Sequence, residues 1–386
     1  MSSINAAVVL TEILRSAPTS RKDIADRRGL SPATVSRAVD HLTASGLVHE
    51  VGEVVESRRG RRAVQLDVVA ERTHVIGVDL GASSTRVVLT DLAGRQVGRI
   101  EEATSSTSTA TDLARAVGAI ARRTAGTRWS TVERVVLGLP GSVDQPTGTV
   151  ANANNLAQVE DPSFIATLQD AIGVPLTLYN DADLALLGEL QLGAAHGASA
   201  AAMLTLGAGL GAALAYRGTI VQGRHGVVGE LGQIPLDSRT RLEDLLTGPG
   251  IIRAAATQGL VLTSPAELFT DALDVNPTVR TLRARFDEAL LLALTAVTVA
   301  CEPEVIIFGG RVSEGLESRW EGYSTGLRQI LRYAPRLTKP ALGAFAGAVG
   351  AAVRGLHDTY RDLGVAEGDL INIPREPRLT SSASAA

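Results

Sequence analysis

The stretch VIGVDLGASSTRVVLTDLAG, residues Val75–Gly94, decides the fold of this chain. An apolar run leads into Asp79, Gly81 interrupts it, and an alternation of apolar and polar residues resumes between Arg86 and Asp91. This pattern is typical of a β-hairpin. Its tip has no large side chain, so backbone N–H groups there can approach an anion, and the Asp79 carboxylate can hold a metal-bound phosphate.

A shortened copy of this pattern lies downstream. Leu80-Gly81-Ala82 recurs as Leu206-Gly207-Ala208, and GAALAYRG, residues 211–218, ends in a second turn at Arg217-Gly218. Two glycine-tipped hairpins about half a domain apart predict a duplicated α/β fold whose two lobes close over one cleft. The alternative is two unrelated tight turns, which the segments around them make less probable.

Length and composition predict a globular protein of two or three domains. The 386 residues exceed one ordinary core, and 45% hydrophobic with only 3% aromatic content indicates cores of Ala, Leu and Val. No apolar run approaches the ~20 residues of a membrane helix, and the N-terminus lacks a signal-peptide pattern. The single cysteine, Cys301, excludes an intrachain disulfide and a Cys-based zinc cluster. We expect a cytoplasmic protein with no membrane partner.

The net charge of −4 is divided unevenly along the chain. Residues 1–72 contain 11 Lys and Arg against 9 Asp and Glu, a balance of +2, whereas the remainder has a balance of −6. The charge is therefore segregated by domain, and the N-terminal segment is compatible with nucleic-acid binding.

The N-terminal segment has the spacing of short helices joined by a tight turn. Asn5–Ser16 predicts a first helix, Ser20 caps a second that ends at Gly29, and Ser31 followed by Pro32 opens a third. One face of this third helix is apolar and consists of Val35, Ala38, Val39 and Leu42.

The opposite face of the third helix is small and polar near its N-terminus, where a recognition helix contacts base edges in the major groove. Behind it, two predicted strands flank an arginine-rich tip that can contact the minor groove or phosphates. The alternative is an ordinary amphipathic helix beside a solvated loop. Either feature alone would favour this alternative, whereas the two together in this order favour DNA binding. The candidate DNA-contacting residues are Thr34, Ser36, Arg37, Arg58, Arg59, Arg61 and Arg62.

Residues 73–373 show alternating strand and helix patterns. The strand 132–139 ends in Pro140-Gly141 and the strand 176–179 ends in Asn180-Asp181, at positions where open α/β sheets bind ligands. We expect two lobes with a boundary near 190–200 and a disordered tail at 374–386. Helices are predicted at 112–124, 162–172, 183–193, 282–300 and about 344–363.

These motifs resemble the ROK family (repressors, open reading frames and kinases), in particular its transcriptional regulators. SRKDIADRRGLSPATVSRAVDHLTASGLV resembles their winged helix-turn-helix, which would occupy residues 1–72. VDLGASSTR and LGAGLGA resemble two phosphate loops, GLPGSVD and ANNL two further segments, NDAD the catalytic-base segment and GVVGELGQ the sugar-binding signature. The resemblance implies a two-lobed, actin-like sugar-kinase ATPase fold, a duplicated ribonuclease H-like unit, behind the DNA reader.

The resemblance also implies a set of sugar-binding residues. Carboxylates and carboxamides recognise hydroxyl-dense ligands because they accept and donate several hydrogen bonds. Asp181 would be the base that takes the proton from the attacking sugar hydroxyl in a kinase. For each acidic residue the alternative is a helix cap or a surface charge. The implied sugar contacts are Asn155, Asp181, Glu230, Gln233 and Glu243.

The chain departs from the family's kinases at the phosphate loops and at the zinc site. The usual Gly-Thr-Lys is Ala82-Ser83-Ser84, and the usual Gly-Thr-Gly is Gly207-Ala208-Gly209. Each lost charge-assisted hydrogen bond is worth ~1.5–3 kcal/mol, so ATP is not expected as a cofactor and Asp181 would be a vestigial base. Gln233 stands at the position of the zinc-binding His, and PLDSRTRLED contains no thiol, so no metal is expected.

Together these features predict a sugar-responsive transcriptional regulator without kinase activity. It would repress carbohydrate uptake or catabolism genes, and its partners would be operator DNA, a sugar effector and further copies in a homodimer or homotetramer. One alternative is an active, glucokinase-like sugar kinase with a DNA-binding domain, which the intact Asn180-Asp181 favours. Another is a regulator whose kinase-like domain only dimerises, against which Asn155, Asp181 and Glu230 argue.

Overall fold

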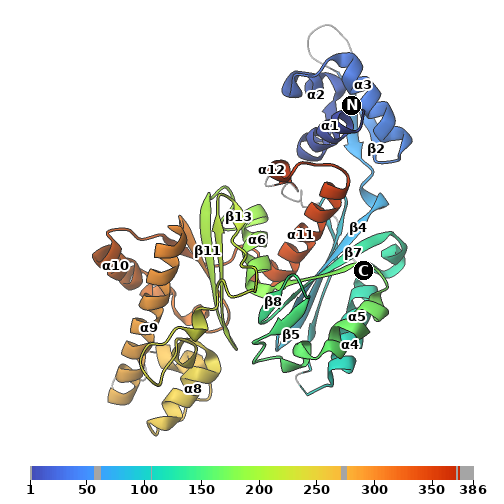
Figure 1. Cartoon of the computed structure of the whole chain (residues 1–386). Coiled ribbons are helices and arrows are strands. Elements are labelled where there is room, and N and C mark those ends of the chain that lie inside the picture. The colour runs from blue at the N-terminus through green and yellow to red at the C-terminus, as the bar shows by residue number, and fades with distance from the viewer. Residues whose placement is uncertain (1, 56–61, 106, 271–275, 371–372, 374–386) are drawn as a thin grey trace.

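The computed structural model describes residues 2–55, 62–105, 107–270, 276–370 and 373 (Figure 1). The predicted tail at 374–386 and the tip of the predicted wing lie outside these ranges. Within the described ranges, no helix combines the length and the apolar character needed to cross a membrane.

Three helices and a three-stranded sheet form the N-terminal unit. Two predicted helix starts are confirmed: the Ser20 side chain forms a complete capping box with Asp23, and the Ser31 side chain accepts a hydrogen bond from the Thr34 N–H. The sheet order β1-β3-β2 makes this unit a winged helix-turn-helix. Its elements are α1 Ser2–Ser16, β1 Thr19–Ser20, α2 Arg21–Arg28, α3 Pro32–Ala44, β2 Val48–Val55 and β3 Arg62–Val68.

The first lobe is built on a five-stranded sheet in the order β10-β7-β4-β5-β6. The predicted hairpin is β4 and β5, and β7 and β10 extend the sheet in parallel with β4. Helices α4 and α5 cover one face, and α11 covers the other (Figure 1). The elements are β4 His74–Leu80, β5 Ser84–Asp91, β6 Gln96–Ala103, α4 Ala110–Ala125, β7 Val132–Leu139, β8 Ser142–Asp144, β9 Thr149–Ala151, α5 Pro162–Ile172 and β10 Leu176–Asn180.

The second lobe repeats the topology of the first. Its sheet has the order β13-β12-β11-β14-β15, in which β11 and β12 form the second predicted hairpin and β14 and β15 run parallel to β11. The duplicated α/β fold is therefore confirmed. The elements are β11 Ala200–Leu206, β12 Leu210–Tyr216, β13 Thr219–Ile220, α7 Glu243–Leu246, α8 Gly248–Thr257, α9 Pro277–Cys301, β14 Val305–Gly309, α10 Trp320–Leu331 and β15 Arg336–Thr338.

Two helices cross between the lobes: α6, Asp181–Leu192, and α11, Ala346–Asp362. Their backbones touch, because a Cβ built on Gly188 would lie 2.7 Å from the Ala346 carbonyl oxygen and one built on Gly350 would overlap the Leu184 carbonyl. Glycine is required at this close approach, since any side chain would separate the two helices.

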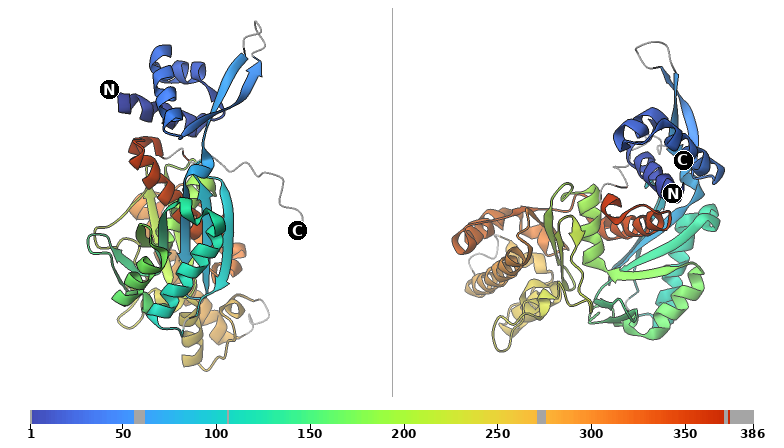
Figure 2. Two further views of the ribbon diagram at one scale, coloured as in Figure 1. Left: turned by 90° about the vertical axis from the view of Figure 1, so that its right-hand side faces the viewer. Right: turned by 45° about the horizontal axis from the view of Figure 1, so that its top comes forward.

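The N-terminal unit shares an apolar cluster with the end of the chain. Val9 and Ile13 of α1 belong to the same buried cluster as Tyr360 at the end of α11 and Leu370 of α12, Glu367–Leu370. Figures 1 and 2 place the N-terminal helices beside α12 and at the opposite end of the molecule from α8. The N-terminal unit therefore packs on the segment that follows α11.

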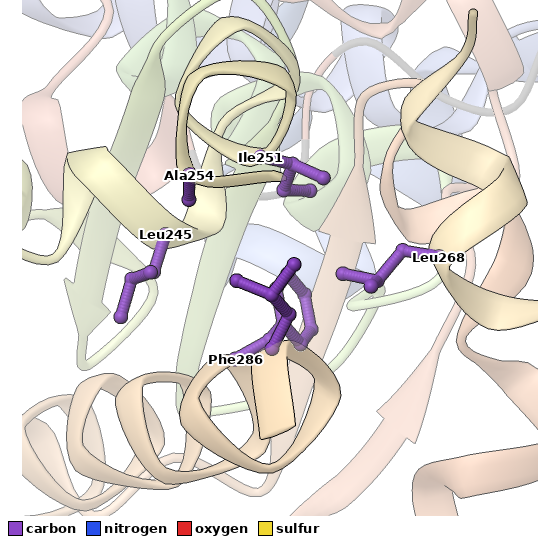
Figure 3. Close-up of a pocket in the computed structure, with 6 residues that line it drawn as sticks. Leu245, Ile251, Ala254, Leu268 and Phe286 are labelled. Atoms are coloured by element: carbon purple, nitrogen blue, oxygen red, sulfur yellow. The ribbon is translucent and has the colours of Figure 1, made fainter. Parts of the chain in front are cut away.

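The second lobe also contains a small apolar cavity, shown in Figure 3. Its volume is about 10 Å³, which is roughly the space of one water molecule. A site for a hydroxyl-rich ligand needs polar groups that this lining lacks. The cavity is a packing gap lined by Leu245, Ile251, Ala254, Leu268, Leu282 and Phe286.

The helix crossing gives a first prediction. Gly350→Ala should lower the free energy of unfolding by about 3 kcal/mol, because the new methyl group overlaps the Leu184 carbonyl and forces α11 away from α6. The matched control is Gly322→Ala in α10, where a Cβ meets nothing within 4 Å and a better helix former should stabilise by about 0.5–1 kcal/mol. Calorimetric unfolding midpoints of both variants check this, and equal midpoints would contradict the backbone contact.

Candidate functional site

The recognition helix α3 presents only part of the predicted DNA-contacting set to solvent. Arg37 is exposed, and its Nε donates to the Ala33 carbonyl oxygen at 3.3 Å. Ser36 and Thr34 are half-buried, and the Thr34 hydroxyl lies 2.8 Å from the Ser31 hydroxyl. Arg37 is therefore the member of this set best placed to reach a base edge.

The predicted wing arginines are only partly described. Arg58, Arg59 and Arg61 lie outside the described residues, and Arg62 begins β3. Their contact with DNA stays a prediction.

Asp181 is the first residue of α6, a helix that contacts strands of both lobes. Asn180 caps this helix: its Oδ1 accepts from the N–H groups of Ala182 at 2.9 Å and Asp183 at 3.2 Å. Its Nδ2 donates to the Gly141 carbonyl oxygen at 3.0 Å, which ties the helix start to the end of the neighbouring strand. Asp181 is thereby held where the strands β7 and β10 end.

A second carboxylate faces Asp181 from the end of β4. Burial raises the pKa of Asp79 to about 7, and the negative charge of Asp181 is the second cause. Burial likewise raises the pKa of Asp181 itself and raises that of Asp183 to about 7. Three carboxyl groups from β4 and α6 therefore lie close enough to influence one another, and sequence reasoning missed Asp183.

The second lobe adds two more acidic residues to this cluster. Burial raises the pKa of Glu230, and the charges of Asp181 and Glu243 raise it further, whereas a hydrogen bond from Ser142 acts in the opposite direction. The structure thus brings together three of the five implied sugar contacts, Asp181, Glu230 and Glu243. Because a sugar hydroxyl donates readily to a carboxylate, this cluster is suited to a hydroxyl-rich ligand.

The other two implied sugar contacts are placed differently. The Asn155 Nδ2 lies 3.6 Å from the position that a Cβ on Gly209 would take, so it faces the turn of the second hairpin. Gln233 is exposed, and its Oε1 accepts a hydrogen bond from Arg241 Nη1. No contact joins the Gln233 side chain to the acidic cluster among the described residues, so its role in sugar binding stays a prediction.

Among the described residues of the first hairpin turn, Gly81 to Ser84, none has a cationic side chain. The nearest cationic residue, Arg86, was not predicted as a site residue, although it lies in the hairpin. Its Nη1 lies 3.7 Å from Asp79 Oδ2 and its Nη2 lies 2.8 Å from Glu101 Oε1. Arg86 is therefore engaged by carboxylates of its own sheet and is not positioned as a replacement for the missing phosphate-loop lysine.

The loop at the family's zinc position is closed by hydrogen bonds. Asp237 Oδ1 accepts from the N–H groups of Arg239 and Thr240, and Pro235 forms a β-bridge with Arg241. In the described part of the chain, no three His, Cys, Asp or Glu side chains are grouped as metal ligands. Burial raises the pKa of the Cys301 thiol to about 11, so this cysteine is not a reactive thiolate.

A protein-family model described as the ROK family matches residues 75–355. The chain belongs to the ROK family. A second model, described as the MarR family, matches residues 3–63, which are the winged helix-turn-helix. The ROK family chain therefore combines a MarR-type DNA-binding fold with a ROK domain.

Known proteins similar to this ROK chain include both regulators and kinases. The xylose repressor of Bacillus spizizenii is 28% identical over 237 residues, which are 61% of each protein. A ROK family transcriptional regulator described as a homologue of the Escherichia coli MLC protein has a TM-score of 0.73, and the match covers 96% of this chain and 99% of that one. It is 22% identical and thus shows the fold. The ROK hexokinase of Thermus thermophilus is 28% identical, with a TM-score of 0.62 and coverage of 72% and 97%.

The matched segment spans 52–61% of the length of the curated relatives.

The carboxyl cluster gives a second prediction, which concerns pH. The ordinary pKa of Asp183 is 3.8, and burial raises it to about 7 in the folded chain. Between these values the unfolded chain releases the proton that the folded chain keeps, so stability falls as pH rises and the loss is complete above pH 7. Asp183→Asn should therefore raise the unfolding midpoint at pH 8 and leave it nearly unchanged at pH 4.

The control for this experiment is Asp170→Asn on α5, where the carboxylate is exposed. Its midpoint should follow the wild type at both pH values. A gain for Asp183→Asn that is equally large at pH 4 would show that repulsion and burial of the charge are not its cause.

Proposed function

We propose that this ROK chain is a sugar-responsive transcriptional regulator that represses carbohydrate uptake or catabolism genes in the cytoplasm. In this proposal residues 1–72 bind operator DNA. Residues 73–373, two lobes with a boundary near 190–200, sense the sugar and form a homodimer or homotetramer. The xylose repressor among its relatives supports this class of function.

The observation that carries the proposal is the path of α11 from the cleft to the DNA-binding unit. A Cβ on Gly347, in the first turn of α11, would lie 2.8 Å from the Asp79 Cγ. At the other end, the Tyr360 hydroxyl donates to the Leu92 carbonyl oxygen at 2.8 Å. One helix thus has its start beside the acidic cluster and its end inside the apolar cluster of the DNA-binding unit.

An ion pair extends this connection to α1. Arg15 Nη2 lies 2.9 Å from Asp369 Oδ1 and donates to the Asp369 carbonyl oxygen at 2.9 Å. A sugar that favours one arrangement of the lobes would move α11 and, through it, the recognition helix. Two recognition helices that must meet grooves ~34–36 Å apart tolerate little change in spacing.

The absence of kinase activity is part of the proposal. Ser83, Ser84 and Ala208 replace the side chains that would bind phosphates, and Arg86 is already paired with Asp79 and Glu101. One observation favours the alternative, an active sugar kinase with a DNA-binding domain. Asn180 caps the helix that begins at Asp181 and so holds Asp181 at the strand ends, where a kinase base would lie.

A third prediction separates DNA binding from sugar sensing. Arg37→Ala should weaken operator binding by ~1–3 kcal/mol, since the exposed guanidinium reads a base, and should leave sugar binding unchanged. Asp181→Ala should bind the operator as the wild type does but lose its response to the sugar. Operator titrations with and without D-xylose, D-glucose or N-acetylglucosamine, paired with calorimetry of sugar binding, measure both effects.

The matched control for Arg37→Ala is Arg115→Ala, which removes another exposed arginine, on α4, and should not change operator affinity. Full sugar-dependent release of Asp181→Ala protein from DNA would place the sensing site elsewhere.

A fourth prediction tests the kinase alternative. Purified protein should release no ADP from ATP in the presence of these sugars beyond the level of Asp181→Asn protein, because the phosphate loops lack the lysine and threonine side chains. Elemental analysis should find less than one equivalent of zinc, since Gln233 cannot replace the histidine ligand. Sugar-dependent ADP release that Asp181→Asn abolishes would establish the kinase instead.

A further inference from the structure

One hydrogen bond joins the two lobes directly at the acidic cluster. Ser142 is the first residue of β8, which follows the first lobe's strand β7, and Glu230 lies in the loop after the second lobe's strand β13. The Ser142 Oγ donates to Glu230 Oε1 at 3.1 Å. Ser142 is 6% exposed, so little water competes for this bond.

The serine itself is held on a rigid support. Ser142 pairs with Ala151 in the β8–β9 hairpin, and a Cβ on the preceding Gly141 would lie 2.5 Å from the Ala151 carbonyl oxygen. The backbone at Gly141 therefore packs directly against β9, and the strand pairing positions Ser142. Glu230, in contrast, lies in a loop and takes its orientation from its partners.

A second side chain directs the hydroxyl proton. Asn152 Nδ2 donates to the Ser142 Oγ at 3.3 Å. Because a serine hydroxyl has a single proton, a donor on the Asn152 side leaves that proton for the Glu230 carboxylate. Asn152 has a φ of 62°, in the left-handed region that Asn and Gly adopt with little strain. The hydrogen bonds from Asn152 to Ser142 and from Ser142 to Glu230 therefore have the same direction, toward the acidic cluster.

We propose that Ser142, oriented by Asn152, is a positioning residue that fixes the Glu230 carboxylate. It thereby determines from which sugar hydroxyl the carboxylate can accept a hydrogen bond. This inference rests on the proposed sugar-sensing function. With Oε1 held by Ser142, Glu230 presents Oε2 to the ligand in one orientation. Without Ser142, the carboxylate can rotate, and epimeric sugars are distinguished less well.

The same bond affects the charge of Glu230. Burial and the charges of Asp181 and Glu243 raise the Glu230 pKa, and the Ser142 hydroxyl lowers it. Along the same loop, His225 Nδ1 lies 3.1 Å from Asp144 Oδ2 of β8. Loss of the serine donor should therefore raise the Glu230 pKa. Since binding needs the ionised carboxylate, sugar binding should be lost at a higher pH than in the wild type as the solution is acidified.

Calorimetry of the full chain with D-glucose, D-mannose, D-galactose and D-xylose tests this inference. Ser142→Ala should bind its best sugar about tenfold more weakly, reduce the affinity ratio between epimers, and shift the acid limb of the pH profile upward. Operator affinity without sugar should not change. The matched control is Thr149→Ala in the same hairpin. It removes a hydroxyl that contacts Thr147 and should change none of these quantities.

Two variants at position 152 test the direction of the hydrogen bonds without touching Ser142. Asn152→Asp places an acceptor where the donor was and draws the serine proton away from Glu230, so affinity should fall almost as far as in Ser142→Ala. Asn152→Gly keeps the left-handed backbone and leaves Ser142 free to donate to Glu230, so its loss should be no more than about threefold. Equal losses of sugar affinity in the two variants would overturn the proposed direction of the hydrogen bonds from Asn152 through Ser142 to Glu230.

The outcomes also separate this inference from the function on which it rests. If the wild type binds a sugar and Ser142→Ala binds it with the same affinity, epimer ratio and pH profile, the positioning role is wrong and the sensing function stands. If the wild type binds neither these four sugars nor N-acetylglucosamine, both are overturned.

Discussion

The backbone contact between α6 and α11 is the constraint on which the other parts of the structure depend. Gly188 and Gly350 allow the two helices to meet without intervening side chains, and both helices run between the lobes. The start of α6 carries Asp181, and the start of α11 lies beside Asp79. Two carboxyl groups that are about 100 residues apart in the chain are therefore brought together by a contact that contains no charge.

The electrostatics of the cleft follow from this placement. Asp79, Asp181, Asp183 and Glu230 all have pKa values raised by burial, and the negative charge of Asp181 adds to the effect on the other three. Of these four carboxyl groups, Asp79 is the one that pairs with Arg86, and the Arg86 guanidinium also pairs with Glu101. An anionic ligand would add to this repulsion, whereas hydroxyl groups donate hydrogen bonds to the carboxylates without adding charge. This difference is the physical reason to propose a neutral, hydroxyl-rich effector.

The sequence predicted the elements that have strong local signals. Both hairpins, the capped helices α2 and α3, and α5 at Pro162–Ile172 were predicted from periodicity, capping residues and turn residues. The edge strand β6 was missed because its residues Gln96–Ala103 are largely exposed on both faces and have no apolar period. The helix predicted from residue 183 begins at Asp181, since Asn180 serves as its N-cap.

The candidate site was predictable only where its residues lie in motifs. Asp181 and Glu230 stand in Asn- and Gly-rich segments that mark ligand loops, and the structure places them in one cluster. Ser142 lies in the quoted segment GLPGSVD, but the segment did not identify it as a site residue, because its partner is 88 residues away in the chain. Asp183 and Arg86 also lie in quoted motifs, NDAD and VDLGASSTR, but they were not named as site residues, because burial and neighbours supplied by the fold give them their role.

Glu189 joins the two chain connections between the lobes. This residue near the end of α6 is fully buried, and its carboxyl oxygens accept from the N–H groups of Ala194, Ala341 and Leu342 at 2.6, 3.0 and 2.8 Å. These acceptors hold both chain connections between the lobes at one point, because residues 193–199 lead into β11 and residues 339–345 lead into α11. Since α11 begins beside this fixed point and ends in the apolar cluster with α1, a rotation of the lobes there turns the helix that supports the DNA-binding unit.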